Sequence, residues 1–409
     1  MNRIVLIGNG FDLAHGLKTK YEHFIDWYWD QRVNGFIGNY TNISIDPLCT
    51  FEIKNKTDFW NVYYYHSPKF ATKFSGKDVV QSLINDTSRY NVVFSPFFER
   101  IIKSIETKGW VDIENEYYKL LTQELRVNSI NTVHTTAKEL NEQLDYLQKS
   151  LIRYLNTIDQ TSITYNDSIH DKIYSPIDPQ DVSIEKQSQL KEYVEWCTKQ
   201  DGRYWKEKMG RYGIPYYTDS EIERYKKDHT ENYPSKYPQA FMLPDQVMLL
   251  SFNYTSTAKL YHKHNFFLNY IHGELDKPES IIFGYGDELD KKYSELRDLN
   301  DNEYMRHVKS INYLESDNYR SVLEFIESAP FQVCIMGHSC GNSDRTLLNT
   351  IFEHKNCISI KPYYYVKEDG TDNYLELVQN ISRNFTDMKL MRDMVVNKTY
   401  TEPLTSPIG

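Results

Sequence analysis

Cysteine is scarce in this sequence and carries no metal-binding or redox spacing. The five cysteines never form a pair with two residues between them: Cys49, Cys197, Cys334, Cys340 and Cys357. This usage indicates neither a zinc ribbon nor a disulfide framework, and it is typical of reduced thiols in the cytoplasm. His262 and His264 lie two residues apart on a predicted helix and point in different directions, so we expect no bound metal.

Long hydrophobic runs and an excess of positive charge are also missing. No apolar run approaches the roughly 20 residues that span a membrane, and Asp12 interrupts the first apolar run before any signal-peptide cleavage site. We therefore expect a soluble, cytoplasmic protein without a membrane partner. The formal net charge of -10 argues against general nucleic-acid binding, which depends on a basic face that releases counterions. No acid cluster has the spacing of a metal-dependent nuclease.

The opening stretch, MNRIVLIGNGFDLAHG, is the clearest candidate for a binding element. The run from Ile4 to Ile7 predicts a strand, and three glycines frame the turn after it: Gly8, Gly10 and Gly16. Such glycines let a ligand approach the backbone, and the N–H groups of a following helix attract phosphate or carboxylate groups. The spacing is G-x-G-x5-G and not the usual dinucleotide-binding fingerprint, so an ordinary strand-turn-helix is the alternative.

Five later apolar runs resemble the first, and each is followed by polar or small residues. They are Val247–Leu250, Phe267–Ile271, Ser280–Phe283, Val333–Met336 and Cys357–Ile360. Continuous apolar runs are typical of parallel strands buried on both faces, so we predict an α/β fold with a parallel, Rossmann-like sheet. Ligands bind such a sheet at the carboxyl ends of its strands, where these polar clusters would gather.

A large insertion separates the first predicted strand from the others. We predict one domain from residues 1–30 and 241–409, and a mostly helical insertion domain over residues 31–240. Apolar residues from Asn131 to Ile158 repeat at steps of three and four, a heptad pattern that needs a long helical partner. That partner is either another helix of the insertion or a second copy of the chain, so we expect a homo-oligomer formed through the insertion. The polar stretch from Asp159 to Gln189 predicts a linker or a mobile loop.

Five stretches follow one another in an order that resembles the signature segments of the sirtuin fold: GNGFDLAHGL, SFNYTST, IHGEL, IIFGYGD and GHSCGNSD. In that family the first holds the NAD pyrophosphate, the second carries an asparagine, the third carries the catalytic histidine, and the last contacts the adenosine-side ribose and phosphates. The pair GNGFDLAHGL and GHSCGNSDRTLL resembles more closely the AbiH family of bacterial phage abortive-infection proteins. The resemblance covers the amino-terminal stretch and the region from Pro244 to Ile360, and it leaves the insertion uncovered.

The resemblance implies a sirtuin-like NAD-binding core in which Asn253 and His272 are catalytic. It implies contacts with NAD, or a related nucleotide, from residues of three stretches: Gly8, Asn9, Gly10, Asp12, Gly16, Tyr254, Gly337, His338, Ser339 and Asp344. Two positions depart from the sirtuin pattern, since Thr255 stands where many relatives have an acid and Asp12 replaces a small hydroxyl residue. The two C-x-x-C pairs of sirtuin deacetylases are absent, so protein deacetylation is disfavoured.

These residue types fit cleavage of the bond between nicotinamide and ribose. The reaction passes through an oxocarbenium-like state and needs a positioned, activated nucleophile. The amide of Asn253 can orient a water or the ribose hydroxyls, and His272 can act as a general base near neutral pH. The alternatives are a turn-forming asparagine and a structural histidine.

A serine hydrolase is a rival interpretation, because GHSCG at Gly337 to Gly341 matches the G-x-S-x-G pattern. His354 is the only histidine after Ser339 and lies within the next predicted helix, which is a poor geometry for a triad drawn from separate strand ends. We expect Ser339 instead to contact phosphate or ribose, and Asp344 to cap the following helix.

The function expected at this point is that of a bacterial antiphage effector that hydrolyses NAD. The antiphage role is implied by the resemblance to AbiH. A non-catalytic alternative is a sensor that binds NAD or a related nucleotide and regulates a partner protein. In either case a phage-derived or host activator is an expected partner.

Overall fold

The computed structural model describes residues 1–38, 42–55, 75–108, 112–124, 136–215, 218–232 and 239–405. The chain divides into two compact units, each built from segments far apart in the sequence. The first unit contains Met1–Leu17, Gln160–Ile282 and Ser310–Gly409, and the second contains Lys18–Asp159 and Phe283–Lys309.

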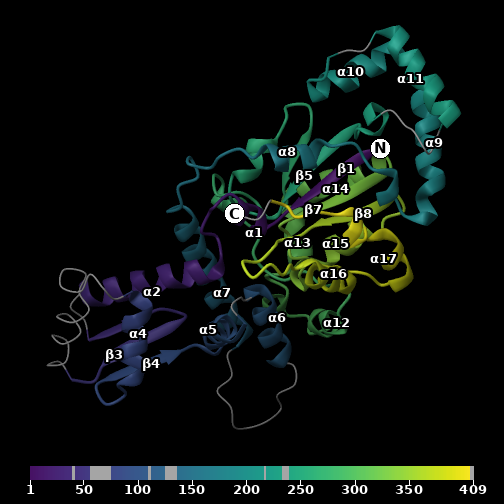
Figure 1. Cartoon of the computed structure of the whole chain (residues 1–409). Helices are drawn as coiled ribbons and strands as arrows, with labels where there is room; N and C mark the ends of the chain where they lie inside the picture. The colour runs from purple at the N-terminus through teal and green to yellow at the C-terminus, as the bar shows by residue number, and fades with distance from the viewer. Residues whose placement is uncertain are drawn as a thin grey trace. The chain divides into compact units, whose positions relative to one another are not determined.

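A five-stranded parallel sheet forms the centre of the first unit (Figure 1). Its strands are β1 (Asn2–Ile7), β5 (Gln246–Ser251), β6 (Phe267–Tyr270), β7 (Phe331–Met336) and β8 (Cys357–Tyr363). They lie side by side in the order β6-β5-β1-β7-β8, and every pairing is parallel. The predicted parallel sheet is therefore confirmed.

Both faces of this sheet are covered, which explains the continuous apolar runs of its strands. On one face, Ile4 and Leu6 of β1 pack in a core with α14 (Asn318–Ser328), α15 (Arg345–Phe352), α16 (Tyr374–Arg383) and α17 (Met388–Met394). On the other face, Val5 and Ile7 pack with α1 (Asn9–Ala14) and α8 (Asp167–Tyr174). Successive residues of a strand point to opposite faces, so a strand buried on both sides is apolar at most positions. The buried polar exceptions Arg3 and Gln332 hydrogen-bond to each other across β1 and β7.

The strand order makes β1 the point at which the chain changes direction across the sheet. From β1 the chain adds β5 and β6 on one side, and later adds β7 and β8 on the other. In open α/β sheets such a switch point opens a crevice at the carboxyl ends of the strands. The polar stretches that follow β1, β5, β6 and β7 all begin at that edge.

The sixth strand expected at Ser280–Phe283 is absent. A 3-10 helix, η6 (Pro278–Ser280), precedes an irregular segment in which Ile281 and Ile282 are buried. The backbone N–H of Ile282 donates to the carbonyl of His272 at 2.9 Å, and the hydroxyl of Tyr254 donates to the carbonyl of Ile282 at 3.1 Å. The run is apolar because it is buried as a loop, and the prediction of a strand from hydrophobicity alone was wrong here.

The boundaries of the units differ from those expected. Residues from Gln160 onwards, expected in the insertion, belong to the unit that holds the sheet. The predicted linker after Asp159 instead forms α8, whose Ile169 and Ile173 are fully buried against the sheet. Three further helices of this unit follow it: α9 (Gln187–Thr198), α10 (Gly202–Tyr212) and α11 (Asp219–Asn232). Polar composition concealed this packing because only three of the eight residues of α8 enter the core: Ile169, Ile173 and Tyr174.

The second unit is not purely helical. Its helices are α2 (Tyr21–Gly38), α4 (Gly76–Asn85), α5 (Pro96–Lys108), α6 (Ile113–Glu124), α7 (Ala137–Leu155) and α12 (Lys291–Asp298). It also contains an antiparallel sheet of β2 (Ile43–Ile45), β3 (Cys49–Ile53) and β4 (Tyr90–Phe94). A short helix, α13 (Lys309–Asn312), begins where the second unit ends.

The predicted heptad helix corresponds to α7, and its start at Asn131 falls outside the described residues. A capping box fixes the observed start, because Thr136 and Glu139 each accept a backbone N–H of the other. The seam is buried at Leu140, Leu144 and Leu147, and α7 lies against α2 and α6. The partner of the seam is thus found within the chain, so the seam no longer supports a homo-oligomer.

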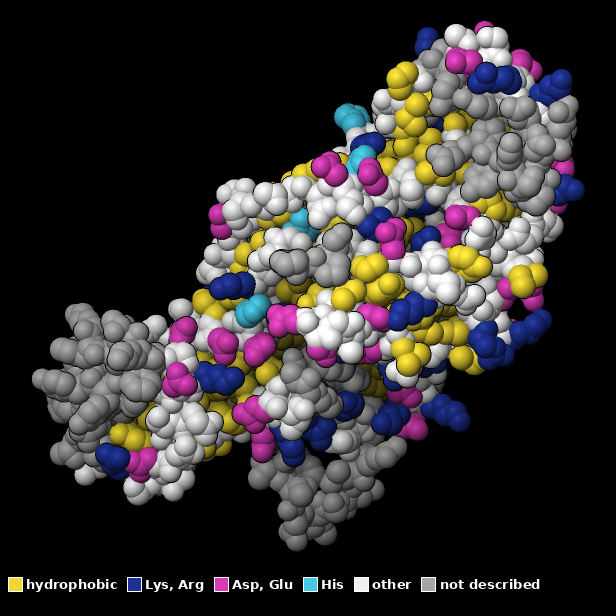
Figure 2. Space-filling model, in the orientation of Figure 1, with side chains coloured by type: hydrophobic (Ala, Val, Ile, Leu, Met, Phe, Trp, Pro, Cys, Tyr) yellow, Lys and Arg dark blue, Asp and Glu magenta, His cyan; other side chains and the backbone are white. Residues whose placement is uncertain are grey.

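Charged side chains of both signs are scattered over the surface in view in Figure 2. On the face shown in Figure 2, Lys and Arg side chains are interspersed with Asp and Glu side chains. Among the residues that the structure describes, no helix is long and apolar enough to cross a membrane.

Candidate functional site

Two turns meet at the carboxyl edge of the sheet, one after β1 and one after β7. The N–H of Gly8 donates to the carbonyl of Met336 at 3.3 Å, and the N–H of Gly10 donates to the carbonyl of Gly337 at 2.8 Å. A Cβ atom on Gly8 would lie 2.5 Å from Cα of His338, and a Cβ on Gly10 would lie 2.8 Å from Cα of Gly337. Glycine is therefore required at both positions because the two turns are in backbone contact.

This contact gives backbone N–H groups of the first turn partners within the chain, whereas from the sequence we expected them to attract a ligand. The helix that follows, α1, has only six residues, and the N–H of Phe11 donates to the carbonyl of Gly8 at 2.8 Å. The N–H groups of Gly10 and Phe11 are thus used within the chain. Asn9, between them, is exposed, whereas Gly16 lies beyond the far end of α1 with φ of +79° and ends the helix.

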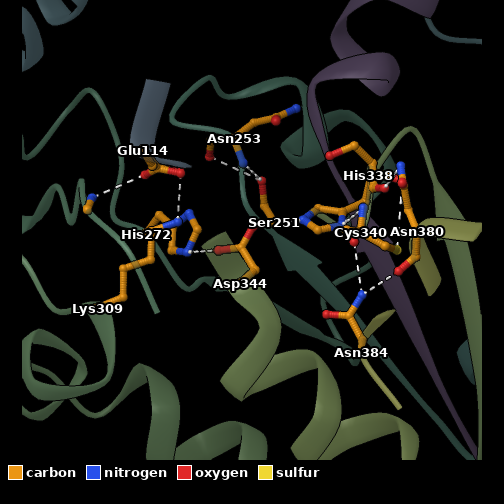
Figure 3. A network of polar contacts seen from close by, with 12 residues as sticks. Glu114, Ser251, Asn253, His272, Lys309, His338, Cys340, Asp344, Asn380 and Asn384 are labelled. Atoms are coloured by element: carbon orange, nitrogen blue, oxygen red, sulfur yellow. Dashed lines mark hydrogen bonds and ion pairs between the residues drawn. The ribbon is translucent and has the colours of Figure 1, made fainter. Parts of the chain in front are cut away.

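Asn253 contacts the glycine turn and the end of β5, and Figure 3 shows the second of these contacts, with Ser251. Its Nδ2 donates to the carbonyl of Gly8 at 2.9 Å, and its backbone N–H donates to Oγ of Ser251, at the end of β5, at 3.2 Å. These bonds fix the amide plane and leave Oδ1 as a possible acceptor at a half-buried position. Tyr254, the next residue, faces the loop at Ile282, to whose carbonyl its hydroxyl donates.

Asp12 and Thr255 form a buried pair between α1 and the segment after β5. Oγ1 of Thr255 donates to Oδ2 of Asp12 at 2.6 Å, and both side chains are almost fully buried. Burial raises the pKa of Asp12 to about 6, although hydrogen bonding from Thr255, Thr257 and Asn253 acts in the opposite direction. The two positions that depart from the sirtuin pattern are therefore in direct contact with each other.

His272 and His338 flank the carboxylate of Asp344 (Figure 3). His272 follows β6, His338 follows β7, and Asp344 lies at the start of α15. Nε2 of His272 is 3.3 Å from Oδ1 of Asp344, and Nε2 of His338 is 3.4 Å from Oδ2. All three side chains are buried, with at most 8% of each residue exposed. A carboxylate in this position orients an imidazole and stabilises the imidazolium that forms when the imidazole accepts a proton.

The orientation of His338 is fixed from its other side. The backbone N–H of Cys340 donates to Nδ1 of His338 at 3.0 Å, so the neutral imidazole carries its proton on Nε2, toward Asp344. Cys340 has φ of +54°, which is unusual for a residue with a side chain and shapes this turn. The amides of Asn380 and Asn384 hold the turn by donating to the carbonyls of Ser339 and Cys340, each at 2.9 Å.

The arrangement around Ser339 lacks the features of a hydrolase elbow. The positive φ angles in this turn belong to Gly337 and Cys340, not to Ser339, which is exposed. Nε2 of His354 lies 3.2 Å from a carboxylate oxygen of Glu327. The expected cap by Asp344 is also absent, since its side chain makes no capping hydrogen bond to α15 and faces the two histidines instead.

Three residues of the site carried no recognised signal in the sequence. Tyr313 lies with its hydroxyl 3.2 Å from Nε2 of His272. Phe252 packs against the rings of both His272 and His338, at centroid distances of 5.2 and 4.1 Å. Thr257 is buried beside Thr255. Phe252, the aromatic residue between Ser251 and Asn253, is the feature of the sequence that could have indicated its packing against the two histidines.

The fourth of the five ordered stretches is divided between the two units, and its first residues, Ile281 and Ile282, belong to the first unit, where the N–H of Ile282 donates to the carbonyl of His272. Gly284 to Asp287 of that stretch lie in the second unit, where the N–H of Gly284 donates to Glu114 at 3.1 Å. Glu114 also pairs with the buried Lys309 at 3.0 Å. The first, second, third and fifth stretches lie together in the first unit.

Within the described part of the chain, no group of three or more His, Cys, Asp or Glu side chains has an arrangement that could hold a metal ion. No curated protein and no solved structure matches the chain. A family model described as bacteriophage abortive infection AbiH matches residues 4–365, which include both glycine turns, Asn253, His272 and Asp344. The chain therefore belongs to the AbiH family of bacteriophage abortive-infection proteins.

Proposed function

We propose that this AbiH protein acts in abortive infection by hydrolysing NAD at the bond between nicotinamide and ribose. The observation that carries the proposal is the buried pair of His272 and Asp344, which lies at the carboxyl edge of the sheet together with Asn253 and the glycine turns. Family membership supports the role in abortive infection. Loss of NAD would halt an infected cell and so stop phage replication.

The chemistry assigns a role to each side chain. Water attacks C1 of the ribose, the bond from C1 to the nicotinamide nitrogen breaks with its electron pair, and nicotinamide leaves as a neutral molecule. The attacking water loses a proton, which His272 accepts, and Asp344 stabilises the resulting imidazolium. Oδ1 of Asn253 accepts a hydrogen bond from the water or a ribose hydroxyl, because its Nδ2 is already held by Gly8.

One observation favours the alternative of a nucleotide sensor without turnover. His272 is only 4% exposed, and its Nε2 is shared between Asp344 and the hydroxyl of Tyr313. A histidine whose ring nitrogen is hydrogen-bonded in this way can stabilise the shape of a binding surface without transferring a proton. The two functions differ in whether NAD is consumed.

The experiment measures NAD and nicotinamide with the purified full chain, and in cells before and after phage challenge so that an activator is present. The variants are His272→Asn and, as a matched control, His264→Ala, which removes an exposed histidine of the same unit. We expect wild type and His264→Ala to release nicotinamide, and His272→Asn to be slower by about 100-fold or more.

Two results would overturn hydrolysis. In the first, NAD stays level in infected cells that are nevertheless protected. In the second, the His272→Asn protein consumes NAD at the rate of wild type. Saturable NAD binding without consumption, together with protection that requires His272, would instead support the sensor.

A further inference from the structure

Both ring nitrogens of His338 have partners within the first unit. Nδ1 accepts the backbone N–H of Cys340 at 3.0 Å, and Nε2 lies 3.4 Å from Oδ2 of Asp344. Because Nδ1 is occupied as an acceptor, the neutral ring carries its own proton on Nε2, the nitrogen that faces the carboxylate. A contact between this ring and the polar groups of a nucleotide would compete with one of these two interactions.

The position of His338 is fixed by its backbone and by its packing. Its Cα lies against the first glycine turn, since a Cβ atom on Gly8 would come within 2.5 Å of it. The turn after it is held by Asn384, whose amide donates to the carbonyl of Cys340 at 2.9 Å. Phe252 packs against the imidazole, and His338 is only 6% exposed. A ring that is already held in place loses little further conformational freedom when it contacts Asp344.

The two oxygens of Asp344 face two different histidines. Oδ1 lies 3.3 Å from Nε2 of His272, and Oδ2 faces His338. In the proposed reaction Asp344 stabilises the imidazolium of His272, which requires an ionised carboxylate with Oδ1 turned toward that ring. An N–H proton directed at Oδ2 favours the ionised form and restricts rotation of the carboxylate. His338 is thus placed to act on His272 through Asp344.

We infer that His338 is a positioning residue, whose Nε2 proton holds the carboxylate of Asp344 in the orientation that stabilises protonated His272. This inference rests on the proposed function. It differs from the role that the resemblance implied for His338, which was a direct contact with the nucleotide. A positioning residue changes kcat through Asp344, whereas a nucleotide contact changes the binding of NAD.

Steady-state kinetics of NAD hydrolysis by the full chain, with phage lysate as a source of activator, test this inference. In His338→Asn the shorter side chain can still accept the N–H of Cys340 but ends before it reaches Asp344. We expect kcat to fall by about 10- to 100-fold, since a hydrogen bond to a charged group is lost, and KM to stay within about threefold. In His338→Gln the longer amide can again donate to Asp344, so kcat should be at least about threefold higher than in His338→Asn.

A second histidine of the first unit supplies a matched control. Nδ1 of His354 accepts the backbone N–H of Asn356 at 3.2 Å, and its Nε2 lies 3.2 Å from a carboxylate oxygen of Glu327. These contacts repeat those of His338 at the opposite end of α15 from Asp344. His354→Asn should therefore keep both kcat and KM of wild type. Circular dichroism confirms that each variant folds.

A double-mutant cycle separates action through Asp344 from a direct contact with the nucleotide. In a chain that already carries Asp344→Asn, the ionised carboxylate that His338 holds is absent. Adding His338→Asn to this chain should then lower kcat by less than about threefold. A nucleotide contact by His338 would instead raise KM by the same factor with or without Asp344.

The outcomes distinguish this inference from the proposed function. If wild type hydrolyses NAD but His338→Asn raises KM at unchanged kcat, the positioning role is wrong and the proposed function stands. The same holds if the full loss in kcat persists in the Asp344→Asn chain, or if His338→Gln is as slow as His338→Asn. If wild type consumes no NAD even with phage lysate, the proposed function fails and the positioning role fails with it.

Discussion

Nε2 of His272 lies 3.3 Å from Oδ1 of Asp344, so a buried imidazole faces a buried carboxylate across the edge of the sheet. If this carboxylate stabilises the imidazolium, replacing it should slow the reaction and leave substrate binding nearly intact. We predict that Asp344→Asn lowers kcat for NAD hydrolysis by about 100- to 10,000-fold with little change in KM.

The control for this prediction is Asp387→Asn, which changes an acid that caps α17 at an exposed position. It should keep wild-type kcat. A rise in KM alone for Asp344→Asn would show that Asp344 acts in binding, which is the role first expected from the sequence.

Asp12 makes the protein less stable at neutral pH. Its pKa rises from 3.8 to about 6 through burial, so the folded state binds the proton more tightly than the unfolded state does. The cost is absent below pH 4, develops between pH 4 and 6, and reaches about 3 kcal/mol at pH 7. Asp12→Asn removes the charge, so we predict a gain of up to about 3 kcal/mol in unfolding free energy at pH 7.

Urea denaturation at pH 4 and pH 7 measures this difference. Wild type should lose stability relative to Asp12→Asn as the pH rises between these values. Parallel curves at both pH values would contradict the prediction, because they would mean that the carboxyl of Asp12 titrates alike in the folded and unfolded states.

The backbone contact between the two turns makes Gly8 intolerant of a side chain. A Cβ atom there would lie 2.5 Å from Cα of His338 and 2.8 Å from the carbonyl oxygen of Gly337, and neither is a flexible side-chain end. We predict that Gly8→Ala destabilises the first unit by at least about 3 kcal/mol, since the two turns must separate. Thermal denaturation checks this.

Gly210 supplies the comparison, because it lies in α10 and a Cβ there meets nothing within 4 Å. Gly210→Ala should stabilise the protein by up to about 1 kcal/mol, as alanine favours a helix over glycine. Equal effects of the two substitutions would show that the close contact of the turns is not required.

The cysteines should be unreactive in the native protein. All five are buried, and burial raises the pKa of Cys49 to about 11 and that of Cys357 to about 12. Cys340, beside the candidate site, is fully buried, and burial raises its thiol pKa as well. We predict no labelling by a thiol reagent before denaturation and five equivalents after it. Rapid labelling of Cys340 would contradict this prediction and would indicate that a cysteine at this turn can act as a nucleophile.

The sheet was largely predictable from the sequence, because a strand buried on both faces is apolar at most positions. The apolar runs within β1, β5, β6, β7 and β8 predicted these five strands correctly, although Phe267 of the edge strand β6 is exposed. The same signal failed at Ile281 and Ile282, since burial of a loop also selects apolar residues. The antiparallel strand β3, in which intermediate residues alternate with buried ones, was hidden by its short length and mixed composition.

The candidate site was predictable in its position but less so in its contacts. Because the strands are parallel, the residues that follow them are expected to meet at one edge of the sheet. These residues are Gly8, Asn253, His272 and His338. Two contacts of the site join segments that are separated by long stretches of chain. One is the contact between the turns at Gly8 and Gly10 and the turn at Gly337, and the other is the contact of Asp344 with two histidines. No local pattern encodes such pairings. Tyr313 likewise reaches His272 from a segment without any motif.

The place of β1 in the sheet also determines when the candidate site can form during synthesis of the chain. Asn2 pairs with Gln246 on one side and with Phe331 on the other, so the first strand to be made stays without neighbours while most of the chain is translated. Synthesis at about 5–20 residues per second makes this a wait of tens of seconds. The edge that carries Gly8, Asn253, His272 and Asp344 forms only once Asp344 has left the ribosome. A truncated translation product that ends before Asp344 therefore cannot carry this site.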